Sequence, residues 1–272
     1  MGCCSEIVLY AAKNLLSVKK NCCFKKAGIL MCKVSVVIAT YNGEKFITEQ
    51  LKSILGQLNN TDEVIISDND STDNTINIIK CFNDDRIRIY KCRTKGIVPN
   101  FENALRHCTG DILFLADQDD VWKANKVEMV KAYLKDYDLV MTDCVITDES
   151  LNPLYKSFYK LKNAGKGLVK NLVSNTYQGS NMAFKRKVMD IALPFPNNIP
   201  MHDMWIGFVC ELFFSVYFIP EKLSFYRRHS DNASTSSRKS EYSFFQQLRF
   251  RLQLLKNIPL LIQRNKHNNS KG

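Results

Sequence analysis

The segment GDILFLADQDDVW, residues 110–122, decides how the rest of the sequence is interpreted. Residues 112–116 form an uninterrupted apolar run, which is typical of a strand buried on both faces of a parallel sheet. The run ends in Asp117, Asp119 and Asp120, like charges whose proximity is costly unless a cation neutralises them. Mg²⁺ and Mn²⁺ prefer such oxygen ligands and usually share them with substrate phosphates. The segment therefore predicts a site for a metal and a diphosphate, with a solvated acidic turn as the alternative.

The composition is that of an ordinary globular protein, with 272 residues of which 45% are hydrophobic and 24% charged. The net charge of +11 indicates an anionic partner or surface, although its sign does not separate nucleic acid, phosphorylated substrates and membranes. No apolar run approaches the roughly 20 residues that span a bilayer, so we expect no transmembrane helix. The ten cysteines form no CxxC pair and no zinc-type spacing. We therefore expect a reduced, cytoplasmic setting.

Strands and helices alternate from residue 33 onward. Strand-length apolar runs, separated by turn signals and by apolar residues at helical spacing, occupy residues 34–40, 63–67, 87–90, 112–116 and 139–142. This alternation predicts an α/β fold with a mostly parallel sheet and right-handed crossovers. Ligands of such sheets bind at the carboxyl ends of strands, where Thr40, Asp68 and Asp117 all fall.

The second half of the chain is less regular. Residues 156–170 are basic with glycine and alanine interruptions, and we expect a mobile loop there. Residues 177–184 read as a strand with a Gly-Ser-Asn kink, and 216–220 and 223–232 as two short strands. Between them, the sequence predicts an apolar helix that starts near Asp203. An aspartate at that place also serves simply as an N-cap or dipole partner.

The tail combines an apolar stripe with basic residues. On one helical face it carries Phe244, Phe245, Leu248, Leu252 and Leu255, with arginine and lysine elsewhere. Pro259 should kink or end the helix. A basic amphipathic helix suits peripheral contact with an anionic membrane, here through residues 241–265. Packing of the same stripe against the main body is an equally common use.

Five segments stand in an order that is characteristic of one enzyme family: VSVVIATYNG, EVIISDNDSTDNT, ILFLADQDDVW, MHDMW and YRRH. Together they resemble the inverting, family-two nucleotide-sugar glycosyltransferases of the A-type fold. The narrower resemblance is to bacterial rhamnosyltransferase-like members that build surface polysaccharides, such as O-antigen or capsule. It implies an A-type fold, with helices flanking a mostly parallel, Rossmann-like sheet, and a C-terminal amphipathic helix.

The resemblance also divides the chain. Residues 1–30 are expected to be an accessory leader or a non-native start. The glycosyltransferase domain would span residues 31–232, with a nucleotide-sugar half at 31–143 and an acceptor half at 144–232. A basic amphipathic tail would follow at 233–272.

Roles for individual residues follow from the resemblance. Asp117 and Asp119 match the DxD motif, which holds a divalent cation (Mn²⁺ or Mg²⁺) and the diphosphate, and Asp203 matches the catalytic base. The remaining residues fall into three groups: nucleotide and donor contacts at Thr40, Tyr41, Asp68, Arg227 and Arg228; a further metal ligand at His229; and an acceptor side at Gly179, Ser180, Asn181, His202 and Trp205. One departure concerns the loop after the second strand. The family has two adjacent aspartates and a glycine there, and this chain has Asn69 and Asp70 after Asp68.

The function implied is transfer of a sugar from a nucleotide-diphosphate donor, of the dTDP-rhamnose or UDP-hexose type, to a saccharide or lipid-linked saccharide. The expected place is the cytoplasm or the inner face of the membrane, and nucleic acid is not an expected partner. One alternative is a phosphatase with Asp117 as nucleophile and Asp119 as acid, although no GDxxxD segment follows. A second is a non-catalytic binding protein for polysaccharide assembly. A dinucleotide oxidoreductase is disfavoured because no GxGxxG follows the first strand.

Overall fold

Strands form where the sequence has apolar, β-branched runs. The computed structural model describes residues 32–229 and 243–270, so the predicted leader, residues 1–30, lies outside the described residues. Val36, Val37 and Ile38 are fully buried, as expected for a strand covered on both faces. In the described ranges one sheet contains β1 (Val34–Thr40), β2 (Glu63–Asp68), β3 (Ile87–Lys91), β4 (Ile112–Asp117), β5 (Val121–Trp122), β6 (Leu139–Thr147), β7 (Pro153–Tyr155), β8 (Met182–Lys185) and β9 (Val216–Arg227).

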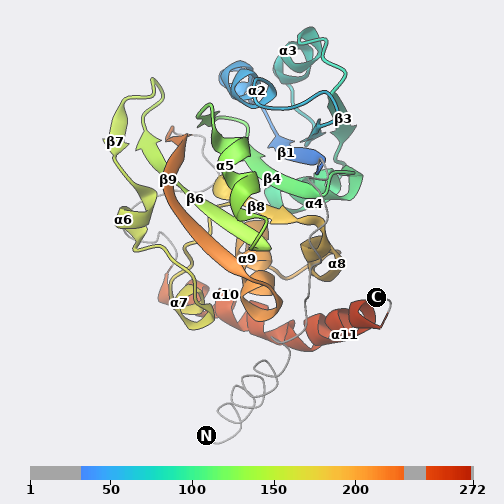
Figure 1. Cartoon of the computed structure of the whole chain (residues 1–272), viewed down its shortest axis with the longest axis vertical. Coiled ribbons are helices and arrows are strands. Elements are labelled where there is room, and N and C mark those ends of the chain that lie inside the picture. Colours follow the sequence, from blue (N-terminus) through green and yellow to red (C-terminus); the bar gives the residue numbers. More distant parts are fainter. Residues whose placement is uncertain (1–31, 230–242, 271–272) are drawn as a thin grey trace, which may run out of the picture. The chain divides into compact units, whose positions relative to one another are not determined.

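The strand order is β3-β2-β1-β4-β8-β6-β9-β5, with β7 paired to β6 (Figure 1). Strands β1 to β4 are parallel to their neighbours in this group, and β6 is parallel to β9. Strand β8 runs antiparallel between β4 and β6. The sheet is therefore mixed but mostly parallel, which confirms the predicted fold class.

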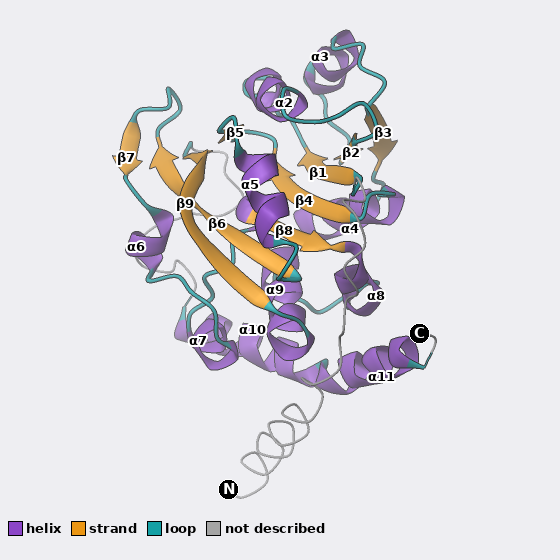
Figure 2. Ribbon diagram, viewed as in Figure 1, coloured by secondary structure: helices purple, strands orange, loops and turns teal. Residues whose placement is uncertain are grey.

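Helices cover both faces of the sheet (Figure 2). On one face, apolar residues of α2 and α5 join those of β1, β2 and β4 in the main core. On the other face, α4 packs against β1 and β2 and also contacts α9. The helices are α2 (Ile47–Leu55), α3 (Thr75–Cys81), α4 (Ile97–His107), α5 (Lys126–Tyr133), α6 (Phe158–Lys162), α7 (Leu168–Val173), α8 (Met189–Ala192), α9 (His202–Phe213), α10 (Phe244–Lys256) and α11 (Ile258–Asn269), with the 3₁₀ turns η1 (Gly179–Asn181) and η2 (Arg186–Val188).

The register of the parallel strands aligns the predicted site residues. Thr40 pairs with Asp68, and Ala39 pairs with Asp117. The carboxyl ends of β1, β2 and β4 therefore end in one row, as the sequence predicted.

Two local predictions were wrong. Residues 216–220 and 223–227 belong to one strand, β9, because a register shift against β6 around Asp143 accommodates Pro220, which lacks an N–H for the ladder. The segment 156–170 is not simply a loop, since it contains α6 and the start of α7. Ser157 caps α6, and the Gly167 N–H that opens α7 donates to the distant Glu211 at 2.6 Å.

The tail forms two helices, α10 and α11, which meet at Asn257, two residues before Pro259. This confirms the predicted break, because proline is compatible with the first turn of a helix and not with its interior. Within the described ranges, no helix is long and apolar enough to cross a membrane.

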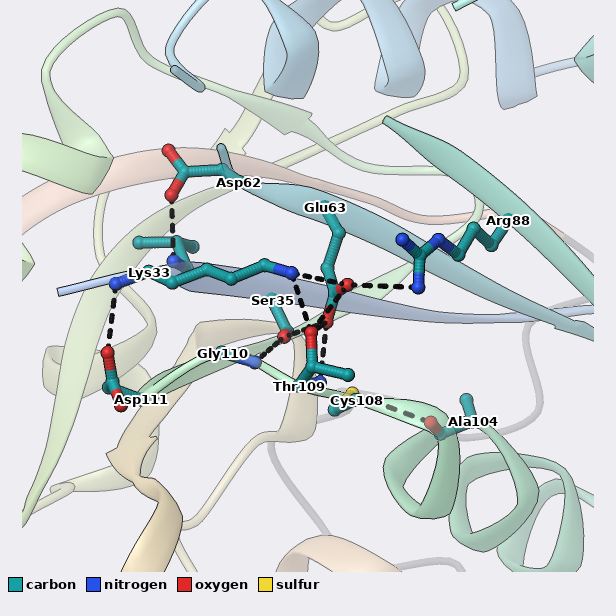
Figure 3. Close-up of polar contacts among 11 residues, drawn as sticks. Lys33, Ser35, Asp62, Glu63, Arg88, Ala104, Cys108, Thr109, Gly110 and Asp111 are labelled. Atoms are coloured by element: carbon teal, nitrogen blue, oxygen red, sulfur yellow. Dashed lines mark hydrogen bonds and ion pairs between the residues drawn. The ribbon is translucent and has the colours of Figure 1, made fainter. Parts of the chain in front are cut away.

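A buried carboxylate ties the amino ends of the strands together (Figure 3). Glu63, 2% exposed, accepts hydrogen bonds from Ser35 Oγ at 2.6 Å, Thr109 N at 2.6 Å and Lys33 Nζ at 3.0 Å. Burial opposes its ionisation, but these donors outweigh burial and lower the pKa of Glu63 to about 2. Gly110 lies so close to β1 that a Cβ there would be 2.6 Å from Ser35 N. The end of the sheet opposite the site is thus fixed by one ionised side chain.

We predict that Glu63→Gln destabilises the protein at pH 7 by about 2 kcal/mol, because an amide group would face several donors. The pKa of Glu63 is lowered from 4.5 to about 2 in the folded protein, so its stabilisation is present above pH 4.5. It is lost as the pH falls towards 2, and the difference between variant and wild type should shrink with it. Urea unfolding across this pH range measures the effect, with the exposed Glu128→Gln as control. A constant difference at all pH values would contradict the assignment.

Candidate active site

Asp68 joins the carboxyl ends of β1 and β2. Thr40 Oγ1 donates to Asp68 Oδ1 at 2.8 Å, and Ser71 donates to the same carboxylate through its N–H at 2.9 Å and its hydroxyl at 2.6 Å. Thr40 is fully buried, whereas Tyr41, the next residue, is 57% exposed. Thr40 therefore supports Asp68, and Tyr41 extends into solvent. Their contacts with a nucleotide stay a prediction.

Gln118, the middle residue of the DxD motif, connects the first and fourth strand ends. Its side-chain oxygen accepts from Tyr41 N and its amide group donates to Tyr41 O, both at 3.0 Å. A Cβ on Gly43 would lie 2.4 Å from the same Gln118 oxygen. The Tyr41 loop thus has a fixed position relative to the acidic segment. Sequence reasoning missed this contact because its spacing pattern concerned the carboxylates on either side.

The departure from the family pattern after β2 has a structural reason. Asn69 donates through its side-chain amide to the carbonyls of Cys92 and Thr94, at 3.1 and 3.0 Å, and accepts from Gly96 N at 2.8 Å. An aspartate could not make the two donations. Asp70 has a φ of +69°, in the left-handed region that glycine adopts most easily. Asparagine is therefore suited to hold the β3–α4 loop.

Four carboxyl groups meet beyond the end of β4. Burial raises the pKa of Asp117 well above its ordinary value, and the neighbouring carboxylates of Asp120, Asp119 and Asp203 raise it further. Burial and the adjacent Asp119 raise the pKa of Asp120 to about 7. Asp203 comes from α9, more than 80 residues away in sequence, so the fold brings the predicted base to the DxD motif. The excess negative charge of this cluster favours binding of a cation.

The carboxyl cluster has one buried lysine beside it. Lys126 is 1% exposed, donates to Ser180 O at 3.1 Å and lies 4.5 Å from the centre of the Trp122 ring. Burial lowers the pKa of Lys126 to about 8, although the charges of Asp120 and Asp117 favour its protonated form. Its ammonium group therefore compensates part of the acidic charge from the interior. A lysine in the amphipathic stretch after Trp122 gave no sequence signal for this role.

Asp203 lies in the first turn of α9. Its carboxylate accepts from Met204 N at 2.7 Å and Gly179 N at 3.2 Å. Burial raises the pKa of Asp203 to about 6, and these backbone donors lower it in part. At pH 7 the group is then mostly ionised and is a stronger base than an ordinary aspartate, which suits proton abstraction.

His202, beside Asp203, is neutral and tightly enclosed. Burial lowers the pKa of His202 to about 3, and its ring stacks on Phe101 with centroids 3.9 Å apart. Neither ring nitrogen has a hydrogen-bond partner within the described part of the chain. A Cβ on Gly179 would lie 2.8 Å from His202 Nε2, so glycine permits the close approach of η1 to α9.

The end of β9 lies against the DxD segment. His229 Nε2 is 2.7 Å from Asp119 Oδ2, and its ring packs against Phe46. Arg227 is 3% exposed, donates through its N–H to Asp120 Oδ1 at 3.0 Å and through Nε to Asp119 O at 2.9 Å, and its guanidinium also contacts Glu49 and Glu149. Arg227 is thus committed to holding the acidic loop in place. Its predicted contact with the donor remains a prediction.

Arg228 and the predicted acceptor residues occupy several environments. Arg228 is partly buried, and its N–H donates to Thr147 O. Asn181 is buried, accepting from Thr142 and donating to Gln178 at 2.9 Å. Trp205 is 0% exposed and donates to Ala192 O at 2.9 Å, so its side chain is part of the core. Ser180 lies beside the carboxyls of Asp117 and Asp120, where it favours their ionised forms. The structure therefore brings Gly179, Ser180 and His202 to the site and places Trp205 behind it.

The donor set at Asp119 and His229 fits a divalent cation. Within residues 32–229 and 243–270, no group of three or more His, Cys, Asp or Glu side chains is arranged to hold a metal ion. Mg²⁺ and Mn²⁺ sites commonly use one or two carboxylates and complete their coordination with substrate phosphates and water. A two-residue protein contribution beside further carboxylates is compatible with that pattern. The full ligand set, including Asp117, remains a prediction.

Fold and site together define a class of protein. An α/β sheet presents a DxD segment at its carboxyl edge, and a helix-borne carboxylate approaches it from the second half of the chain, as in A-type nucleotide-sugar glycosyltransferases. The model of Glycosyl transferase family 2 matches residues 35–191, and the chain belongs to this family. This membership favours sugar transfer over the aspartyl-phosphatase alternative.

Two curated bacterial relatives illustrate the range of the family. The Escherichia coli UDP-Glc:alpha-D-GlcNAc-diphosphoundecaprenol beta-1,3-glucosyltransferase WfgD is 29% identical over 154 residues, which cover 53% of this chain and 60% of that protein. The Shigella flexneri dTDP-rhamnosyl transferase RfbG is 38% identical over 99 residues, or 34% of each chain. Both matches span less than two thirds of the relative.

A solved structure confirms the fold. The mannosyltransferase PcManGT from Pyrobaculum calidifontis, in complex with GDP-Man and Mn²⁺, superimposes with a TM-score of 0.58 at 22% identity. The match covers 82% of this chain and 65% of that one.

We predict that Lys126→Met, a change of similar volume, destabilises the protein by about 3 kcal/mol at pH 8, because it leaves Asp120 without its buried counter-charge. The pKa of Asp120 is raised to about 7, so protonation at lower pH should relieve part of this loss. Urea unfolding at pH 8 and pH 5.5 measures both effects. The exposed Lys135→Met on the same side of α5 is the control and should stay within about 0.5 kcal/mol. Wild-type stability of the Lys126 variant would refute the compensation.

Proposed function

We propose that the protein transfers a sugar from a nucleotide-diphosphate donor to a hydroxyl of a saccharide or lipid-linked saccharide, by direct displacement with inversion. The observation that carries the proposal is electrostatic. The carboxylate of Asp203 is close enough to Asp117 to raise its pKa, while Asp203 itself has a pKa of about 6. A DxD motif and a basic carboxylate therefore share one site, which is what a single displacement requires.

The donor end of the reaction needs positive charge. Asp119 and His229 are the residues that would hold Mn²⁺ or Mg²⁺, with Asp117 nearby, and such a cation would stabilise the negative charge of the departing diphosphate. The name of the structural relative PcManGT, which includes Mn²⁺, supports this choice. Asp68 and Tyr41, at the ends of β2 and β1, would contact the nucleotide.

The acceptor end of the reaction needs a base. In the proposed step Asp203 takes the proton of the acceptor hydroxyl as its oxygen forms a bond to the anomeric carbon. The bond from that carbon to the diphosphate oxygen breaks, and the diphosphate leaves with the electron pair. The backbone donors of Gly179 and Met204 would hold the carboxylate in place during this transfer. A neutral His202 next to the base would bind an acceptor hydroxyl without competing for the proton.

The donor sugar is proposed only as a class. The relatives are named for UDP-Glc, dTDP-rhamnose and GDP-Man transfer, so they support a nucleotide-sugar donor without selecting one. The two bacterial relatives favour a rhamnosyl or hexosyl donor. The diphosphoundecaprenol acceptor in the name of WfgD supports a lipid-linked saccharide in surface-polysaccharide synthesis as the acceptor proposed here.

Asp203→Asn should abolish transfer and leave donor binding nearly unchanged, because the amide keeps the shape of the carboxylate and cannot accept the proton. A panel of dTDP-, UDP- and GDP-sugars with Mn²⁺, read by thermal stabilisation, first selects the donor. Turnover of that donor is then measured for wild type and variant. A drop of at least about 100-fold in kcat is expected. Near-normal turnover would show that another group is the base, and no turnover by the wild type with any donor would favour the non-catalytic alternative.

Asp119→Ala should weaken donor binding only when the divalent cation is present, since it removes a ligand that the cation and the protein share. Calorimetry with the selected nucleotide diphosphate, with Mn²⁺ and with EDTA, separates the two conditions. We expect about tenfold weaker binding with Mn²⁺ and no change with EDTA. Asp136→Ala, on the surface after α5, is the control. Equal affinity of the Asp119 variant with Mn²⁺ would exclude its metal role.

The pH dependence of kcat should report the base. Burial raises the pKa of Asp203 to about 6, and the base is active when ionised, so the rate should rise with pH through 6 and level off above 7. At pH 5 the rate should be about a tenth of the plateau. A pH profile that is flat between 5 and 7 would contradict the assignment.

A further inference from the structure

The tail helices use a narrow face to pack on the main body. Leu254 of α10 is 3% exposed and Leu261 of α11 is fully buried. Leu254 meets Leu168, Leu172 and Phe208 around a small cavity between α7, α9 and α10. Arg251 fastens α10 to the end of α7 by donating to the carbonyls of Leu172 and Val173. Helices α7 and α10 are thus one joined unit.

The apolar stripe predicted from the sequence is not the face that packs. Leu248 and Leu252 are 41% and 48% exposed, and Phe245 is 80% exposed. On α7, Val169 and Val173 are 73% and 64% exposed. These five residues form what we term the α7–α10 surface. Exposed apolar groups gathered on neighbouring elements mark interaction sites more often than chance, because leaving them in water is unfavourable.

The sequence around this surface has no acidic residues. Residues 150–189 contain eight lysines and arginines and no aspartate or glutamate, and residues 242–272 contain six and none. The remaining 24 cations and 27 acids give the rest of the chain a net charge of −3. The whole excess of positive charge therefore belongs to the two segments that carry the α7–α10 surface. Lys160, Lys166, Arg249 and Lys256 among them are exposed.

This combination selects among possible occupants. Aliphatic side chains with surrounding lysine and arginine match the acyl chains and headgroups of an anionic bilayer, where each basic residue near the surface adds affinity. A second copy of the chain would bring two acid-free faces together, and like charges would oppose the contact. Nucleic acid would use the cations, but exposed valine and leucine offer its phosphates nothing.

We propose that the α7–α10 surface docks the protein on an anionic lipid bilayer. Helix α9, which carries Asp203 in its first turn, packs between this surface and the site, since its Phe208 touches the same small cavity as Leu254. Docking would hold the site near a lipid-linked acceptor, and this consequence rests on the proposed function. The docking itself does not. Figure 1 places α10 and α11 at the end of the molecule away from α2 and α3, which therefore provide control positions.

The test is co-sedimentation of the full chain with vesicles of phosphatidylcholine alone or with about one third phosphatidylglycerol. Wild type should bind the anionic vesicles and not the neutral ones, and high salt should release it. Leu248→Gln combined with Leu252→Gln should weaken binding by at least about tenfold, because two exposed leucines no longer enter the lipid. Arg249→Gln with Lys256→Gln should weaken it by about fivefold per charge.

Matched controls keep the result specific. Leu154→Gln, at an exposed leucine on β7, and Lys52→Gln with Lys80→Gln, on α2 and α3, should bind as wild type does. Binding to neutral and anionic vesicles alike, wild-type binding by the Leu248/Leu252 variant, or equal losses in the controls would overturn the proposal. So would binding of single-stranded RNA that displaces the vesicles and ignores the leucine changes. No substrate is present, so these results are independent of turnover, which is measured separately with a water-soluble acceptor.

Discussion

The rest of the site depends on the placement of four carboxyl groups in a space with little water. Asp117, Asp119 and Asp120 come from one strand end, and Asp203 arrives from a helix in the other half of the chain. Their mutual repulsion raises pKa values and would open the site unless the protein compensated it. Lys126 and the backbone N–H of Arg227 supply part of that compensation from inside. The part that remains gives the site its affinity for cationic and metal-bound diphosphate ligands.

The scaffold that resists this repulsion is built at both ends of the sheet. At the amino ends, the ionised Glu63 collects donors from β1 and from the segment before β4. At the carboxyl ends, Gln118 connects the Tyr41 loop to the acidic segment, and Arg227 connects that segment to β9. Rigid strands between these two sets of bonds keep the carboxylates at a fixed separation. A cluster of like charges can persist only where the surrounding structure is fixed in this way.

Much of the fold could be predicted from the sequence, because the decisive signals are local. The apolar run before Asp117 and the strand–helix alternation gave the α/β sheet and the row of strand ends. The site was harder. Asp203 could be assigned through its resemblance to a family motif, but Lys126 and Gln118 act through contacts about 55 to 75 residues away in sequence. Spacing patterns carry no such information. The single strand β9 was missed because Pro220 reads as a break and the compensating bulge depends on β6.

The central claim is that Asp203 and the DxD segment act on opposite sides of one sugar. It is tested most directly by a crystal structure of the protein with Mn²⁺ and an unreactive analogue of the donor sugar nucleotide. The account predicts the cation at Asp119 and His229, the diphosphate beside it, and an Asp203 oxygen on the face of the anomeric carbon opposite the diphosphate. A sugar bound with Asp203 on the same face as the diphosphate, or separated from Asp203 by another side chain, would contradict it.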